Sequence, residues 1–195
     1  MGSGSHSESS RKKADGERLF IAIDLPEEVR RTLIRTAESM DLNNARYSRL
    51  EQMHLTLRFL GNVSEDQKEC LIQGLDEIRL PSFSLETDAL GVFPRRGLPR
   101  ILWVGLKEPG ILNELQRSIE EAVEKCGFEA DDKPWYPHIT LVRLNGKNHL
   151  APEILEATSD QYKNMRFPVD AFYLYRSELK KSGAVYSIQE TFKLT

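Results

Sequence analysis

Apolar residues recur along the chain at two spacings, which predict strands and helices in alternation. β-Branched and aromatic residues cluster at 18–26 (RLFIAIDLP) and 53–61 (MHLTLRFLG), as is typical of strands. Residues 27–40 carry apolar side chains at helical spacing, and the capping-box pattern SEDQ at 64–67 introduces a second helix. The first part of the chain therefore reads as strand, helix, strand, helix.

The second part of the chain continues this alternation. The expected elements, in chain order, are strands at 83–90 and 100–106 joined by a basic loop at 93–100 (FPRRGLPR), a helix at 110–125, a strand at 137–144 (PHITLVRL), a shorter helix near 151–162, and antiparallel strands at 167–179 and 184–194. Hairpin connections predict an α+β fold with mainly antiparallel sheets. A marked strand followed by a helix occurs twice, which indicates two pseudo-symmetric lobes, each a sheet with helices on its outer face.

The first 17 residues lack this patterning. They are rich in Gly and Ser and then charged, so they predict a flexible tail, and residues 1–7 (MGSGSHS) resemble a cloning remnant. His6 belongs to that tail. We expect one bilobal domain over 18–195.

Composition narrows the classes of partner. The formal net charge of −3 argues against a protein that coats long nucleic acid, which requires a broad basic face, but allows a small anionic ligand or an RNA end. No apolar run approaches the roughly 20 residues that cross a bilayer, and no secretory leader is recognisable. We therefore expect a cytoplasmic protein without membrane association. Cys70 and Cys126 have the spacing of neither a disulfide framework nor a zinc site and are expected to be reduced structural thiols.

Two of the predicted strands open with the same pattern, His-x-Thr. Because side chains alternate across a strand, His54, Thr56 and Arg58 are expected on one face and Leu55, Leu57 and Phe59 on the other. In the second strand His138 and Thr140 share a face, opposite Ile139 and Leu141. The two polar faces are expected to meet across a central cleft.

One such motif alone would be an ordinary strand with a partly buried histidine. The repetition changes this interpretation, since two of the three histidines outside the tail have the same setting, whereas His149 has none and is expected at the surface. Two imidazoles can act as proton donor and proton acceptor near neutral pH. Threonine hydroxyls can donate hydrogen bonds to phosphate oxygens. The pattern therefore favours phosphoryl chemistry without a metal or cofactor.

Other chemistries have weaker support in the sequence. Neither motif supplies a second zinc ligand at a short fixed offset, and neither cysteine lies beside a histidine. The chain contains no Gly-x-Ser-x-Gly elbow, Walker loop or dinucleotide fingerprint.

Cationic and aromatic side chains supply further candidate ligand contacts. Arg143 suits a phosphate, but strict alternation places it opposite His138 unless the strand bulges or ends. The other candidates are Arg58 for phosphate, Arg95, Arg96 and Arg100 for attracting a polyanion, and Phe20, Trp103, Trp135 and Tyr136 for stacking on a base. Each has a structural alternative, either as a solvated charge or as a core aromatic.

The stretches LFIAIDLP, HLTLRFLG, RILWVGL and YPHITLVR, in this order, resemble the RNA 2′,3′-cyclic phosphodiesterase family, also called 2′-5′ RNA ligases, of the two-histidine phosphoesterases. The resemblance covers almost everything after the tail. It implies a bilobal α+β fold whose two motifs meet in a central cleft. The expected substrate is RNA or a nucleotide ending in a 2′,3′-cyclic phosphate, opened to a 2′-phosphate without metal.

The resemblance also assigns roles to individual residues. It implies that His54 protonates the departing 3′ oxygen, that His138 activates water, and that Thr56, Thr140 and Arg143 contact the phosphate. Some members of the family join 2′-5′ linkages, including those of transfer RNA halves, so ligation is a second expected activity. The family often has Trp where this chain has Tyr47.

Two alternatives to an enzyme remain open. One is a nucleotide- or RNA-binding module on the same fold without turnover, and the other is a structural protein whose motifs are ordinary strands. Intact His and Thr in both motifs favour the enzyme. A monomer is expected, because neither a metal nor a symmetric interface is implied.

Overall fold

A computed structural model describes residues 16–107, 110–131, 133–145, 152–181 and 183–195. The strands are β1 (Glu17–Asp24), β2 (Arg46–Tyr47), β3 (His54–Val63), β4 (Phe83–Arg95), β5 (Leu98–Leu106), β6 (His138–Arg143), β7 (Arg166–Val169), β8 (Ala171–Lys180) and β9 (Gly183–Lys193). The helices are α1 (Glu27–Glu38), α2 (Glu65–Asp76), α3 (Gly110–Lys125) and α4 (Pro152–Ser159), with a short 3-10 helix at Leu50–Gln52. None of the described helices is both long enough and apolar enough to cross a membrane.

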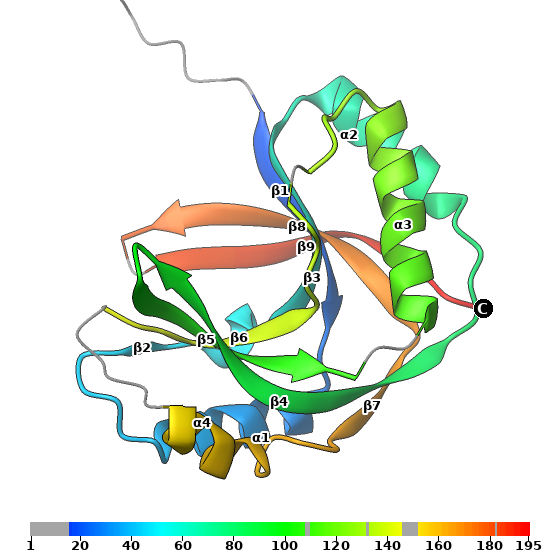
Figure 1. The fold of residues 1–195 in the computed structure, drawn as a ribbon. Coiled ribbons are helices and arrows are strands. Elements are labelled where there is room, and N and C mark those ends of the chain that lie inside the picture. The colour runs from blue at the N-terminus through cyan, green and yellow to red at the C-terminus, as the bar shows by residue number, and fades with distance from the viewer. Residues whose placement is uncertain (1–15, 108–109, 132, 146–151, 182) are drawn as a thin grey trace, which may run out of the picture.

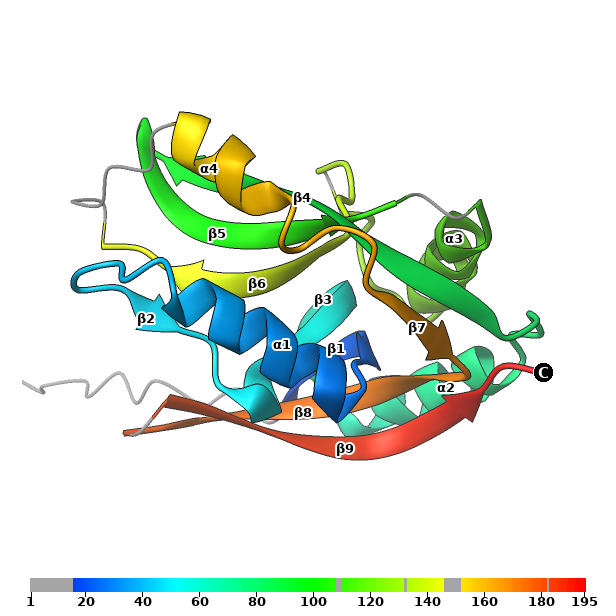
Figure 2. The same cartoon turned by 90° about the horizontal axis from the view of Figure 1, so that it is seen from below.

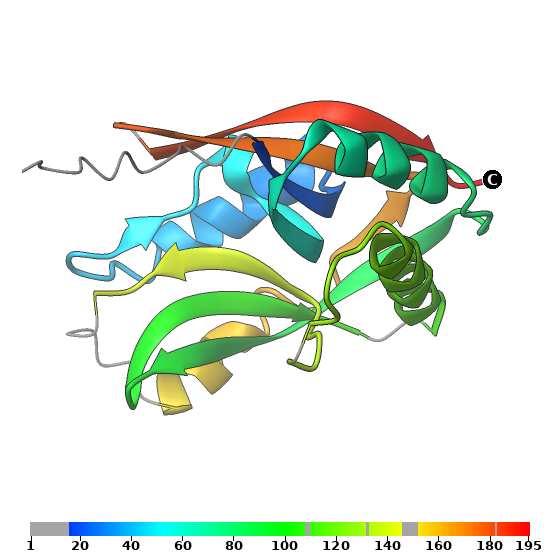
Figure 3. The ribbon, with the colours of Figure 1, turned by 90° about the horizontal axis from the view of Figure 1, so that it is seen from above.

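All strand pairs in the described chain are antiparallel, in the order β7-β4-β5-β6-β3-β1-β8-β9, with β2 beside β6. Figure 2 shows β4, β5 and β6 along one side of the molecule and β8 and β9 along the other, with β3 and β1 between them. Figure 3 shows the same division from the opposite side. The predicted α+β fold with mainly antiparallel strands is confirmed.

The sheet divides into two halves at the junction of β3 and β6. These strands share a single facing pair, Leu55 with Ile139, and both side chains are fully buried. We call this pair the seam. One half contains β3, β1, β8 and β9, and the other contains β7, β4, β5 and β6.

The helices begin and pack as their sequences predict. Ser64 accepts a hydrogen bond from the backbone of Gln67, whose side chain accepts one from the backbone of Ser64, so the capping box forms. Helix α3 spans the predicted residues, and its apolar stripe is buried, namely Leu112, Leu115, Ile119, Ala122 and Val123. Figure 1 shows α2 and α3 together on one side of the molecule, and α1 and α4 on another.

Two predicted boundaries are wrong. The expected basic loop at 93–100 is mostly strand, because β4 and β5 form one long hairpin that turns at Arg96 and Gly97, both with positive φ. The expected strand at 167–179 is two strands, β7 and β8. They pair with different neighbours, β4 and β1, so the chain changes direction between them.

The prediction of reduced thiols is also wrong, since Cys70 and Cys126 form a disulfide. Helices α2 and α3 pack closely because Gly74 faces Ala122, where an added Cβ would lie 3.5 Å from the Ala122 Cβ. This approach brings the two cysteine Cα atoms to 5.8 Å. Since α2 follows β3 and α3 follows β5, the disulfide links the two halves of the sheet.

Candidate active site

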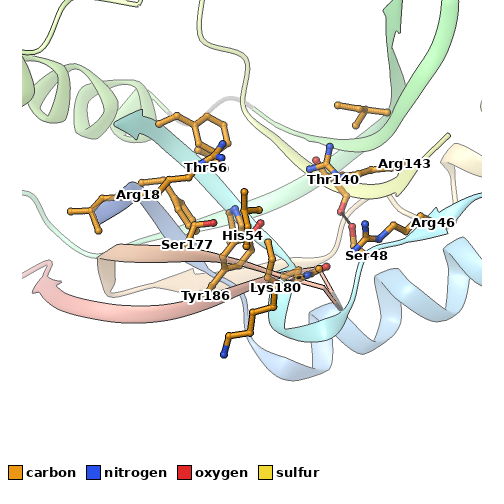
Figure 4. A pocket seen from close by; sticks show the side chains of 18 of the residues that line it. Arg18, Arg46, Ser48, His54, Thr56, Thr140, Arg143, Ser177, Lys180 and Tyr186 are labelled. Carbon is orange, nitrogen blue, oxygen red and sulfur yellow. Dashed lines mark hydrogen bonds between the residues drawn. The ribbon is translucent and has the colours of Figure 1, made fainter. Parts of the chain in front are cut away.

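The polar faces of both motifs open into one cleft between the two halves. His54, Thr56, His138 and Thr140 all line this cavity of about 540 Å³, which we call the central cleft. Figure 4 shows Thr56 and His54 on one side and Thr140 on the other. The structure thus brings together side chains that lie far apart in the sequence.

The seam sets the positions of both histidines. Leu55 directly follows His54, Ile139 directly follows His138, and these two apolar residues face each other. Each strand thereby buries its apolar side and turns its histidine toward the cleft. Both imidazoles are partly buried.

His138 is held by its own backbone segment. Its Nδ1 atom lies 2.8 Å from the carbonyl oxygen of Tyr136. A carbonyl only accepts, so in the neutral ring Nδ1 carries the proton and Nε2 has the free lone pair. The ring of Phe93 meets the imidazole edge-on at 4.8 Å. Burial lowers the pKa of His138, and the charge of Arg143 adds to this, while the Tyr136 hydrogen bond acts in the opposite direction.

His54 lies against aromatic rings. The ring centroids of Phe20 and Tyr186 are 4.8 and 5.4 Å from that of its imidazole. Burial lowers the pKa of His54 to about 4, with smaller contributions from the charges of His138 and Arg143. Both histidines are therefore neutral near pH 7 in the free protein. A bound anion would raise both pKa values.

The two threonines are positioned through their backbones. The indole Nε1 of Trp135 donates to the carbonyl of Thr56 at 3.1 Å. The hydroxyl of Ser48 donates to the carbonyl of Thr140 at 2.8 Å. Both bonds hold a motif strand while the threonine side chain lines the cleft.

Arg143 reaches the cleft because β6 bulges. The pairing register with β5 shifts between Leu102 and Trp103, so that Leu141 faces no residue of β5. Val142 is then buried and Arg143 is exposed. The alternation that would have placed Arg143 opposite His138 is broken, and its side chain lines the cleft.

The faces predicted for Arg58 and Phe59 are wrong. The β1–β3 register shifts between Ile21 and Ala22, which reverses the alternation after Leu57. Arg58 is only 8% exposed, does not line the central cleft and pairs with Glu120 at 3.5 Å and Asp131 at 3.3 Å.

Phe59 is instead 66% exposed and lines the cleft. It occupies the fifth position after His54, the position that Arg143 occupies after His138. The two motif strands therefore bulge at equivalent places but present an aromatic ring in one case and a guanidinium in the other.

The other candidates divide between the cleft and the core. Phe20 lines the cleft beneath His54 and is 3% exposed, with its ring stacked on Tyr175. Tyr136 is 54% exposed and borders a neighbouring pocket of about 520 Å³ that shares Thr56, Phe59 and His138 with the central cleft.

The remaining predicted residues lie elsewhere. Trp103 is buried and Trp135 is partly buried. Arg95, Arg96 and Arg100 do not line the central cleft, and His149 lies outside the described residues.

The acidic and basic side chains in the described lining of the central cleft are all basic. Its described lining contains no aspartate or glutamate but four cationic residues, Arg18, Arg46, Arg143 and Lys180. Three of these were missed by sequence reasoning, because each lies in a different strand and no local motif marks it. In the part of the chain that the structure describes, no group of three or more His, Cys, Asp and Glu side chains is placed to hold a metal ion. The cleft suits an anionic ligand.

Comparison with known proteins identifies relatives over most of the chain. The family model described as the 2′-5′ RNA ligase superfamily matches residues 25–181. The RNA 2′,3′-cyclic phosphodiesterase of Archaeoglobus fulgidus is 30% identical over 178 residues, covering 90% of this chain and 99% of the relative. The protein of the same name from Thermus thermophilus is 34% identical over 185 residues, covering 91% and 90%.

Solved structures show the same fold. The crystal structure of Escherichia coli LigT complexed with 3′-AMP superposes with a TM-score of 0.81 at 29% identity, covering 93% of this chain and 99% of that one. A Thermus thermophilus structure, TT0787, has a TM-score of 0.74 at 31% identity, covering 91% and 97%.

Proposed function

Since the chain belongs to the 2′-5′ RNA ligase superfamily, we propose that it is an RNA 2′,3′-cyclic phosphodiesterase that hydrolyses a cyclic phosphate to a 2′-phosphate. The observation that carries this proposal is the histidine pair at the seam, inside a cleft lined by cations and, among its described residues, by no carboxylate. A cyclic phosphate at an RNA end carries one negative charge, and the cleft offers it hydroxyl and guanidinium donors.

The two histidines divide the proton transfers. Nε2 of His138 takes a proton from water as its oxygen attacks phosphorus, and His54 gives a proton to the 3′ oxygen as the P–O3′ bond breaks. Thr56, Thr140 and Arg143 donate to the other phosphate oxygens, where charge is held through the transition state. Each proton transfer is typically worth about 10²–10⁴ in rate. This chemistry requires no metal.

The low pKa of His54 gives the substrate a role in preparing the catalyst. In the free protein its imidazole is neutral at pH 7, whereas an acid must carry a proton. The negative charge of a bound phosphate favours the imidazolium and raises the pKa. Protonation of His54 is thus coupled to binding of the anion on which it acts.

Ligation uses the same transfers with another nucleophile. If a 5′-hydroxyl replaces water, His138 deprotonates it, its oxygen attacks phosphorus, and the 3′ oxygen leaves with the proton from His54. The product is a 2′-5′ phosphodiester. Incubating an RNA with a cyclic phosphate together with an RNA with a 5′-hydroxyl, and separating the products by length, measures the share of ligation.

The proposal predicts hydrolysis in the presence of EDTA. The protein is incubated with 2′,3′-cyclic nucleotides and the product is identified by phosphorus NMR as a 2′-phosphate. His138→Ala should lose about 10²–10⁴-fold in rate, whereas His149→Ala, which alters a histidine outside both motifs, should not. Binding of nucleotide without turnover would reject the enzyme hypothesis in favour of the nucleotide- or RNA-binding module. Activity that survives His138→Ala would overturn the assignment of the base.

Monomeric state and cytoplasmic location belong to the same proposal. A cleft within one chain needs no partner subunit to complete it. A cytoplasmic location requires that the Cys70–Cys126 disulfide persist in a reducing compartment, where such bonds are rare. Light scattering tests the monomeric state, and thiol titration of protein purified without reductant tests whether the disulfide is formed.

A further inference from the structure

Arg18 lies too far along the cleft to act on the phosphate held by the motif residues. In the pairing of β1 with β3, Ala22 faces Thr56, whereas Arg18 faces Asn62 at the far end. Four residues of strand separate the two rows, or roughly 13 Å at about 3.3 Å per residue. Figure 4 shows Arg18 on the opposite side of His54 from Arg143. The cleft thus offers cations at two separate places.

The charge of Arg18 is not compensated by the protein. Within the described chain it forms no ion pair, and its cleft contains no described carboxylate. The adjacent Glu17 is already occupied by Lys68 at 2.7 Å and Arg176 at 2.9 Å, and the Lys68 hydrogen bond holds the pKa of Glu17 below its usual value. A guanidinium left unpaired at a cleft wall is suited to an anionic group of the ligand.

An exposed aromatic ring lies between the two cationic places. Phe59 faces Phe20 in the β1–β3 pairing, in a row between Arg18 and Ala22. Its side chain is 66% exposed and lines the cleft, with its ring 6.0 Å from that of Phe20. Nucleobases stack on exposed aromatic rings of this kind. Phosphate donors, an aromatic ring and a cation thus follow one another along the cleft.

We propose that Phe59 and Arg18 form a second subsite, in which the terminal nucleobase stacks on Phe59 and the next phosphodiester of the strand binds Arg18. The protein therefore prefers RNA ends of two or more nucleotides over a cyclic mononucleotide, which has no second phosphate. This inference rests on the proposed function.

The test compares kcat/KM for uridine 2′,3′-cyclic phosphate and for a trinucleotide with the same cyclic end. Wild type should favour the trinucleotide, and Arg18→Gln should lower the ratio of the two values about tenfold, as expected for one charged hydrogen bond. Phe59→Ala should lower both values about tenfold, because the stacked base is common to both substrates. Arg166→Gln removes an exposed arginine that does not line the cleft and should leave the ratio unchanged. A ratio for Arg18→Gln equal to that of Arg166→Gln would overturn the subsite.

A binding measurement separates the subsite from the proposed reaction. A trinucleotide labelled at its 5′ end and ending in a 2′-phosphate is titrated with protein, and its fluorescence anisotropy is followed at several salt concentrations. Arg18→Gln should weaken binding and lower the slope of log K against log salt by about 0.7, as for one lost phosphate contact on a single strand. Weakened binding without turnover of any cyclic phosphate would retain the subsite and reject the hydrolase. Normal turnover with unchanged binding would do the reverse.

Discussion

The Nδ1 atom of His138 lies 2.8 Å from the carbonyl oxygen of Tyr136, two residues earlier in the chain. This contact fixes the tautomer of the neutral ring, so Nε2 is the atom that can take a proton. A backbone acceptor this close in sequence also moves with the histidine. In the proposed mechanism the base is therefore prepared by its own strand, whereas His54 depends on the bound anion for its proton.

The pH dependence of kcat/KM should have both limbs below pH 6.5. Burial and neighbouring charge place the pKa of His54 at about 4 and that of His138 below its ordinary value in the free protein. The acid loses its proton as pH rises, and the base gains one as pH falls, so activity declines on both sides of an acidic optimum. Initial rates at low substrate concentration from pH 3.5 to 8.5 measure the profile.

The kcat profile should lie at higher pH than that of kcat/KM, because the phosphate in the complex raises the pKa of both imidazoles. An alkaline limb of kcat/KM above pH 7 would contradict the assigned state of the histidines. Uridine 2′,3′-cyclic phosphate carries no group that titrates over most of this range, which makes it the appropriate substrate.

Substitutions of Arg143 should show in kcat/KM whether the site needs a guanidinium or only a positive charge. Arg143→Gln should lower kcat/KM about 10- to 100-fold, since a hydrogen bond to a charged group contributes about 1.5–3 kcal/mol. Arg143→Lys keeps the charge but loses the fork geometry and should fall between wild type and Arg143→Gln. Steady-state kinetics with Arg166→Gln as control checks this, and equal rates for all four proteins would remove Arg143 from the site.

Breaking the disulfide should destabilise the protein. A Cys70→Ser/Cys126→Ser double variant should lose about 2–4 kcal/mol of unfolding free energy, because the crosslink closes a long loop whose ends have a sequence separation of 56. Urea unfolding followed by tryptophan fluorescence, with and without dithiothreitol, measures the loss. Dithiothreitol should bring wild type to the level of the variant and leave the variant unchanged. A wild type indifferent to reductant would mean that the thiols are free in solution.

Gly91→Ala should damage both stability and activity. The indole of Trp103 occupies the space that a Cβ at residue 91 would need, and this indole contacts Tyr136 and His138. Overpacking of this kind costs about 1–3 kcal/mol. The control is Gly110→Ala, where an added Cβ meets no atom within 4 Å. Unfolding midpoints and kcat of both variants check the prediction, and equal behaviour of the two would contradict the close packing of Trp103 on Gly91.

Periodicity predicted the elements well where the direction of a side chain depends only on the geometry of its own helix or strand. The apolar stripe of α3 from Leu112 to Val123 is one case, since helical spacing alone places these residues on the buried face. A shared cleft was also predicted, because the two strands carry the same His-x-Thr pattern on their polar faces, and both motifs do line one cavity.

The errors concern features that depend on partners elsewhere in the chain. Alternation misplaced Arg58 and Phe59 because a bulge is decided by the register of the neighbouring strand. For the same reason alternation alone could not decide whether Arg143 reaches the cleft. The disulfide was missed because only the packing of α2 on α3 brings Cys70 to Cys126. Arg18 was not predicted for a similar reason, since its position along the cleft follows from the pairing of β1 with β3.

The seam has a consequence for how this protein tolerates change. A substitution at Leu55 or Ile139 alters the one place where β3 and β6 face each other, and each of these residues is covalently next to a cleft histidine. A change in the packing of the two halves would therefore alter the spacing of the two histidines directly. The outer strands can tolerate substitutions that affect stability alone. At the seam the same kind of substitution would change both stability and the alignment of the two histidines.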